Sequence, residues 1–148
     1  MKLIKFPSAH LSTKCSEVKD FKTLDTIVQR LFALCKSKKR PGVGMAAPQL
    51  GKDIRLFVTW YNKKPRVFVN PELRGVSVDE NTSKESCISF SKVVTYPIKR
   101  SSQIVLKWQT LSGEEKEEKF EGFEARIIQH ELDHINGITM YDRWEMQK

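Results

Sequence analysis

The chain has 148 residues, of which 39% are apolar and 30% are charged. This length suffices for one hydrophobic core, and the composition excludes a disordered polymer, so we expect a single domain over residues 1–148. No run approaches the roughly 18 consecutive apolar residues of a membrane span, and the apolar stretch near Met1 is too short for a secretory signal. We therefore expect a cytoplasmic protein with no membrane partner.

The formal net charge of +8 is concentrated at the start of the sequence, where residues 1–50 hold ten Lys and Arg against three Asp and Glu. The densest run, Lys36 to Arg40, could contact ribosomal RNA, but a short charge run is more often a solvated helix end. We expect no DNA partner and keep the ribosome as a hypothesis. The three cysteines, Cys15, Cys35 and Cys87, are odd in number and widely spaced, which favours free thiols over a disulfide framework.

Helical and strand-like patterns follow one another in the order of an α+β domain. Apolar residues recur at three- and four-residue steps from Phe21 to Cys35, which predicts an amphipathic helix that must end by Pro41-Gly42. Runs of β-branched and aromatic residues then predict antiparallel strands at Ile54–Trp60, Arg66–Val69 and Gln103–Trp108, with a hairpin through Ser112-Gly113 to Lys116–Phe120.

A helical pattern returns at Phe123, and Asn136-Gly137 is placed to end it. The order of helix, several strands and late helix predicts an α+β fold in which antiparallel sheets pack around this last helix. The remaining residues are expected to form a frayed end.

The late helix contains the sequence His130-Glu131-Leu132-Asp133-His134. Helical spacing places the two imidazoles on one side, where their neutral nitrogens can bind a divalent metal, and Glu131 can take a proton from a water that the metal activates. The pattern therefore predicts a metal-dependent hydrolytic site, and the alternative is an accidental match of two surface or core histidines. We interpret Asp133 as a supporting or salt-bridge residue, not a catalyst.

A catalytic metal site needs a third protein ligand, and the residues after His134 do not offer a good one. A metzincin protease would have a histidine at Met140, and Glu145 lies close to the expected frayed end. Upstream, Cys87 lies in a polar segment between predicted strands, whereas the other two cysteines are interpreted as small buried apolar residues. Cys87 is therefore the candidate third ligand.

Three separated segments carry further information: Gly42-Val43-Gly44-Met45-Ala46-Ala47-Pro48-Gln49, Glu85-Ser86-Cys87-Ile88-Ser89, and Gln129 to Gly137. In this order they resemble the three signature motifs of the peptide deformylase family. The sequence departs from the family at Ser86, where glycine is usual, and at Ser91-Lys92, where Pro-Gly is frequent. It also ends soon after the third motif, so we expect a short form without the long C-terminal helix of many bacterial members, similar to phage- or organelle-associated ones.

The resemblance implies an enzyme that hydrolyses the N-formyl group of the N-terminal formyl-methionine of nascent polypeptides and releases formate. By this resemblance one divalent metal is bound by Cys87, His130 and His134, with Fe²⁺ typical in cells and Zn²⁺ or Ni²⁺ as alternatives. Glu131 is implied as the general base. The Gln49 amide and the Ile88 backbone N–H are implied as donors to the developing oxyanion.

For the substrate, the resemblance implies that Gly44 admits the peptide backbone, while Val43, Phe123 and Ile127 line an apolar pocket for the methionine side chain. Phe123 and Ile127 could equally be core residues beneath the helix. Two other functions stay open at this point. One is a metallopeptidase that cuts internal peptide bonds, and the other is a catalytically silent module that binds nascent peptides or ribosomal RNA.

Overall fold

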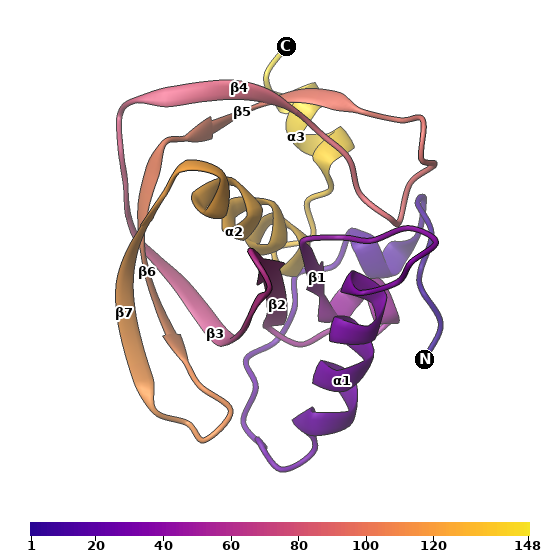
Figure 1. Cartoon of the computed structure of the whole chain (residues 1–148), viewed down its shortest axis with the longest axis vertical. Coiled ribbons are helices and arrows are strands. Elements are labelled where there is room, and N and C mark those ends of the chain that lie inside the picture. The colour runs from indigo at the N-terminus through magenta and orange to yellow at the C-terminus, as the bar shows by residue number, and fades with distance from the viewer.

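The computed structural model of the chain describes all residues from Met1 to Lys148. Its main elements, drawn in Figure 1, are α1 (Leu24–Cys35), β1 (Gly44–Ala46), β2 (Leu56–Tyr61), β3 (Lys64–Val76), β4 (Glu80–Glu85), β5 (Tyr96–Ser101), β6 (Gln103–Gln109), β7 (Glu115–Glu121), α2 (Gly122–Ile135) and α3 (Met140–Met146). Short 3-10 helices cover Ala9–Leu11 and Ala47–Leu50. None of the helices combines the length and the apolar character that crossing a bilayer requires.

The strands form two antiparallel sheets around α2. The larger sheet has the order β1-β2-β3-β6-β7, and β4 pairs with β5 in a separate ribbon. Because β3 runs on into β4 and β5 into β6, the two sheets form one bent surface: β4 and β5 arch over α2, while β3, β6 and β7 lie along its other side (Figure 1). The prediction of an α+β fold with antiparallel sheets around the late helix is confirmed.

Strand β2 shows how the sequence builds a core on both faces of the larger sheet. Alternate residues of a strand point to opposite faces. Phe57 belongs to the apolar cluster that includes Ile128 of α2, whereas Leu56 and Val58 belong to the cluster that includes Leu31 of α1. All five side chains are almost fully buried. Since each contributes about 1.5–3 kcal/mol on burial, α1 and α2 are both fixed firmly against this strand.

The predicted hairpin at Ser112-Gly113 is present, with β6 and β7 in register from Gln109 opposite Glu115 onward. Gly113 adopts a φ of 86°, which glycine allows without strain. The three cysteines are free, as predicted, and Cys15 and Cys35 are buried, as also predicted; Cys87 is buried as well.

Several element predictions were wrong or too short. Strands β4 and β5 were not predicted, because β4 is polar and five of its six residues are exposed. The strand predicted at Arg66–Val69 is only part of β3, and the first helix begins at Leu24, not at Phe21. The expected frayed tail instead contains α3.

The start of α3 is fixed by a reciprocal pair of caps, the Thr139 side chain accepting from the Asp142 N–H and the Asp142 side chain accepting from the Thr139 N–H. This Thr-x-x-Asp spacing was the sequence signal for the helix.

Candidate metal centre and active site

The three residues predicted as metal ligands lie together in the structure. His130 and His134 project from one side of α2 with ring centroids 5.0 Å apart, and Cys87 follows the end of β4. Cys87 Sγ lies 3.5 Å from His134 Nε2. One donor atom from each of the three residues lies within 4.8 Å of the others. A thiolate and two imidazoles at this separation fit a tetrahedral metal site with one position left for another ligand.

Glu85 orients the first imidazole. His130 Nδ1 donates to Glu85 Oε1 at 2.8 Å, which leaves His130 Nε2 as the ring nitrogen for a metal. Glu85 also accepts from Arg100, with two bonds of 2.9 Å, and from Arg126 at 2.7 Å. Burial alone would raise the pKa of Glu85, but the hydrogen bonds from His130 and Arg100 outweigh it and hold the pKa well below its usual range. Glu85 is therefore a fixed anion.

Glu85 belongs to the second motif, and no role was predicted for it. A carboxylate two residues before a metal-binding cysteine was the available signal. Asp133, which was interpreted as a supporting or salt-bridge residue, is a salt-bridge residue bonded to Arg100 and Arg143 and does not contact either imidazole.

Glu131 is a buried carboxyl with unused hydrogen-bonding capacity. Only 3% of the residue is exposed, and Oε1 has no hydrogen-bond partner. Burial raises the pKa of Glu131 to about 7. A Cβ added at Gly44 would lie only 2.8 Å from Glu131 Oε2, so glycine at this position leaves the space that the carboxyl occupies. A carboxyl that titrates near neutral pH can act as both acceptor and donor of a proton.

The two predicted oxyanion donors lie beside Cys87. Gln49 Oε1 accepts from the Ala46 N–H at 2.9 Å, which fixes the amide so that Nε2 points to Ser89 Oγ at 3.1 Å and lies 3.5 Å from Cys87 Sγ. The backbone N–H of Ile88 donates to no protein acceptor. Both groups can therefore donate to a substrate oxygen that approaches the cluster.

The loop that carries Cys87 is fixed from below by Arg40. Its guanidinium donates to the carbonyl oxygens of Cys87 at 2.9 Å, Ile88 at 3.3 Å and Phe90. The interpretation of Lys36 to Arg40 as a solvated helix end is therefore wrong for Arg40, which holds the ligand loop.

Ser86 has no left-handed backbone. The non-glycine residues with positive φ are Asn62, Lys63 and Asn70. The departure from the family pattern at Ser86 is thus accommodated without φ strain.

One cavity of about 290 Å³ joins the predicted site residues. Gln49, Cys87, Ile88, His130 and Glu131 line it together with Gly44, Val43, Phe123 and Ile127. Ile127 is 3% exposed, whereas Val43 and Phe123 are 40% and 50% exposed. The predicted apolar residues therefore share the cavity with Cys87 and His130, and one of them is buried while the other two are exposed.

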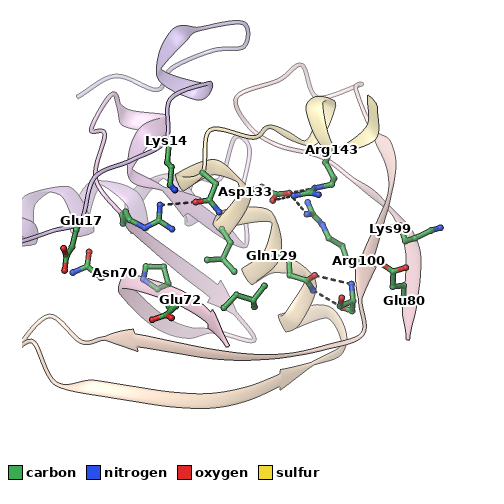
Figure 2. A pocket seen from close by; sticks show the side chains of 16 residues that line it. Lys14, Glu17, Asn70, Glu72, Glu80, Lys99, Arg100, Gln129, Asp133 and Arg143 are labelled. Atoms are coloured by element: carbon green, nitrogen blue, oxygen red, sulfur yellow. Dashed lines mark hydrogen bonds and ion pairs between the residues drawn. The ribbon is translucent and has the colours of Figure 1, made fainter. Parts of the chain in front are cut away.

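A larger cavity of about 750 Å³ lies against a different face of α2 (Figure 2). Its lining is mostly charged and polar and includes Gln129, Asp133 and Arg143. None of the residues predicted to bind metal or substrate lines it. The smaller cavity is the candidate active site, because Cys87, His130 and the unpaired carboxyl of Glu131 line it.

Comparisons with known proteins agree with the fold and identify the family. The sequence model of the family described as "Polypeptide deformylase" matches residues 1–148. The peptide deformylase of Thermotoga maritima is 36% identical over 122 residues, which make up 82% of this chain and 70% of the relative. The crystal structure of the T. maritima enzyme has a TM-score of 0.90 at 34% identity and covers 96% of this chain and 95% of its own.

A second solved structure, the Met-Ala-Ser-bound class I type b peptide deformylase from Acinetobacter baumannii, has a TM-score of 0.88 at 28% identity, with 97% of each chain covered. With the family match extending over residues 1–148, the chain belongs to the polypeptide deformylase family.

Proposed function

We propose that this chain removes the N-formyl group from the N-terminal formyl-methionine of nascent polypeptides by metal-dependent hydrolysis of a linear amide. The observation that carries the proposal is a cavity lined by Cys87, His130 and the unpaired carboxyl of Glu131, with the His134 donor atom within 4.8 Å of the other two donors. Family membership supports the formyl substrate. The A. baumannii relative bound to Met-Ala-Ser suggests a peptide of that kind as the product here.

The donor set supports a transition metal. One thiolate and two imidazoles suit Fe²⁺, Zn²⁺ or Ni²⁺, and we propose Fe²⁺ as the ion in cells. The bound ion supplies Lewis acidity and makes a water molecule easier to deprotonate. Glu85 holds the His130 ring in the orientation that presents Nε2.

Glu131 transfers a proton from the attacking water to the departing amine. It accepts one from the attacking water as the new bond forms to the formyl carbon, and it passes that proton to the departing amine as the C–N bond breaks. Formate and a free methionine amine are the products. The Gln49 amide and the Ile88 N–H donate to the formyl oxygen while negative charge builds there, and each such donor contributes about 3–4 kcal/mol in comparable enzymes.

The substrate chain lies along β1. This strand is at the edge of the larger sheet, so one side of its backbone at Gly44 is free to pair with an added strand. Val43, Phe123 and Ile127 then enclose the methionine side chain in the cavity.

The decisive experiment distinguishes the proposed general base, Glu131, from a proposed metal ligand, Cys87. We expect Glu131→Gln to keep one equivalent of metal and to lower formate release from formyl-Met-Ala-Ser by about 10²–10⁴-fold, while Cys87→Ala loses the metal. Elemental analysis and a formate assay on both variants test this. Near-normal turnover by Glu131→Gln would exclude the proposed role of Glu131.

The same assay separates the other functions. Cleavage of casein without formate release by the metal-loaded protein would favour the metallopeptidase, and RNA binding without either reaction would favour the silent module. We propose the cytoplasm of a bacterium, or of a phage-infected host, as the place of action, with formyl-methionyl nascent chains as partners.

A further inference from the structure

A continuous row of paired charges, buried except at Arg143, joins α3 to the predicted metal ligands. Arg143 of α3 donates to Asp133 at 2.6 and 3.1 Å, and Asp133 accepts from Arg100 at 2.5 Å. Arg100 in turn donates two bonds to Glu85, which accepts from His130. Figure 2 shows Arg143, Asp133 and Arg100 converging beside the larger cavity. The row therefore ends at Nδ1 of a predicted metal ligand.

Because most members of this row are buried, the loss of one ion pair within it costs free energy. The side chains of Arg100, Glu85 and Asp133 are 4%, 6% and 9% exposed, whereas that of Arg143 is 33% exposed. An ion removed from such a row leaves its partner buried and short of hydrogen bonds. Arg143 is the most accessible member, so it can be changed without opening a large internal cavity.

Arg100 is shared between two carboxylates, Glu85 and Asp133, and Arg143 bonds the second of them. One edge of the Arg100 guanidinium bonds both oxygens of Glu85, and Nη1 bonds Asp133. Asp133 receives three hydrogen bonds from these two arginines, two of them from Arg143. Without Arg143, Asp133 would retain only Arg100 among these donors, and a buried carboxylate short of donors attracts its remaining cation more strongly.

We infer that Arg143 is a positioning residue for the metal centre, which acts through Asp133 and Arg100 on Glu85 and thereby on the imidazole of His130. This inference rests on the metal-dependent function proposed above. It assigns α3 a part in the site, although no residue of α3 lines the active-site cavity.

The test compares Arg143→Met with a variant of the same helix that lies outside the row. Gln147 accepts from the Lys99 N–H at 2.7 Å and donates to the Pro97 carbonyl at 3.1 Å, so Gln147→Ala loosens α3 from β5 without changing any member of the row. The probe is Co²⁺ added to the metal-free protein. Its dissociation constant is measured by competition with a chelator, and its visible absorption reports ligand geometry.

We expect Arg143→Met to weaken Co²⁺ binding by about 3- to 10-fold and to alter the absorption bands, less than the roughly 10- to 100-fold typical when a direct partner of a metal ligand is lost. Gln147→Ala should lower the melting temperature and leave both Co²⁺ readouts unchanged. Arg143→Lys, which retains the charge but not the two-bond geometry, should fall between parent and Arg143→Met.

A melting temperature lowered equally in Arg143→Met and Gln147→Ala, with the parental Co²⁺ affinity and spectrum in both, would overturn the inference and leave Arg143 as an anchor of α3. If Arg143→Met does not fold, parental Co²⁺ readouts in Arg143→Lys would have the same meaning. Because Co²⁺ binding needs no substrate, failure of the formate assay would count against the proposed reaction and not against this role of Arg143.

Discussion

At the scale of single residues, the buried and unpaired carboxyl of Glu131 lowers the stability of the fold. Its carboxyl is buried, Oε1 is unpaired, and burial raises its pKa to about 7, above the value of about 4.3 expected in the unfolded chain. A raised folded-state pKa means that stability present below the unfolded pKa is lost as the pH rises through the folded pKa. The residue proposed to transfer the proton therefore lowers the free energy of unfolding at neutral pH, where its buried carboxyl ionises.

This gives a prediction for Glu131→Gln in the metal-free protein. Glutamine has no proton to lose, so the variant should avoid the loss of about 2–4 kcal/mol that the parent shows between pH 4 and pH 8. Urea unfolding of both proteins across this range measures the difference. A difference in unfolding free energy that is the same at every pH would contradict the raised pKa.

Ser86 gives a second prediction at this scale. Since its φ is not positive, glycine relieves no strain there and only adds freedom to the unfolded chain. We expect Ser86→Gly to lower the free energy of unfolding by about 0.5–1 kcal/mol with metal content retained. Thermal unfolding of the metal-loaded protein tests this, and a higher melting temperature would show that the loop is strained after all.

At the scale of elements, α2 could be predicted from sequence because its periodicity and its metal-binding pattern coincide. Strand β2 could be predicted from its apolar residues, and the β6–β7 hairpin from the turn at Ser112-Gly113. The β4–β5 ribbon has neither, because β4 is held by pairing with β5 and by the burial of one residue, Glu85. The two histidines of the donor cluster were therefore predictable from α2, and Cys87 from its polar segment and motif. The partners of Glu85 were not, since Arg100 and Arg126 reach it only through long-range packing.

The close approach of β1 to α2 predicts the effect of Gly44→Ala. The added Cβ would meet Glu131 Oε2 at 2.8 Å, so the carboxyl must move. A shift of about 1 Å in a catalytic group can cost 10²-fold in rate, and we expect formate release to fall by at least about 10-fold with little loss of stability. Gly75→Ala is the control, because nothing lies within 4 Å of a Cβ there. Equal formate release by Gly44→Ala and Gly75→Ala would contradict the proposed role of the Glu131 carboxyl.

At the scale of the whole molecule, the basic run from Lys36 to Arg40 contains side chains with contacts inside the protein and side chains without them. Arg40 holds the Cys87 loop, and Lys36 lies over the Trp60 ring at 4.4 Å. Lys38 and Lys39 are exposed and form no hydrogen bond or ion pair. Of this run, these two are the residues free to contact a ribosome.

We therefore predict that Lys38→Glu/Lys39→Glu weakens co-sedimentation with ribosomes most strongly at low salt, since exposed charges are screened as salt rises. Turnover of short formyl peptides should not change. Lys116→Glu/Lys119→Glu on β7 makes the same change in net charge elsewhere. If both double variants sediment like the parent, the run has no ribosomal role.

The separation of the donor residues along the chain also has a consequence for synthesis. Cys87 and His134 are 47 residues apart, and β5, β6 and β7 lie between them. During translation the thiol is made first, and it has no imidazole partner until α2 has left the ribosome and packed between the two sheets. Metal binding by the three proposed ligands is therefore expected only late in the synthesis of the chain. A protein proposed to act on nascent chains must itself be synthesised as far as His134 before all three proposed ligands are present.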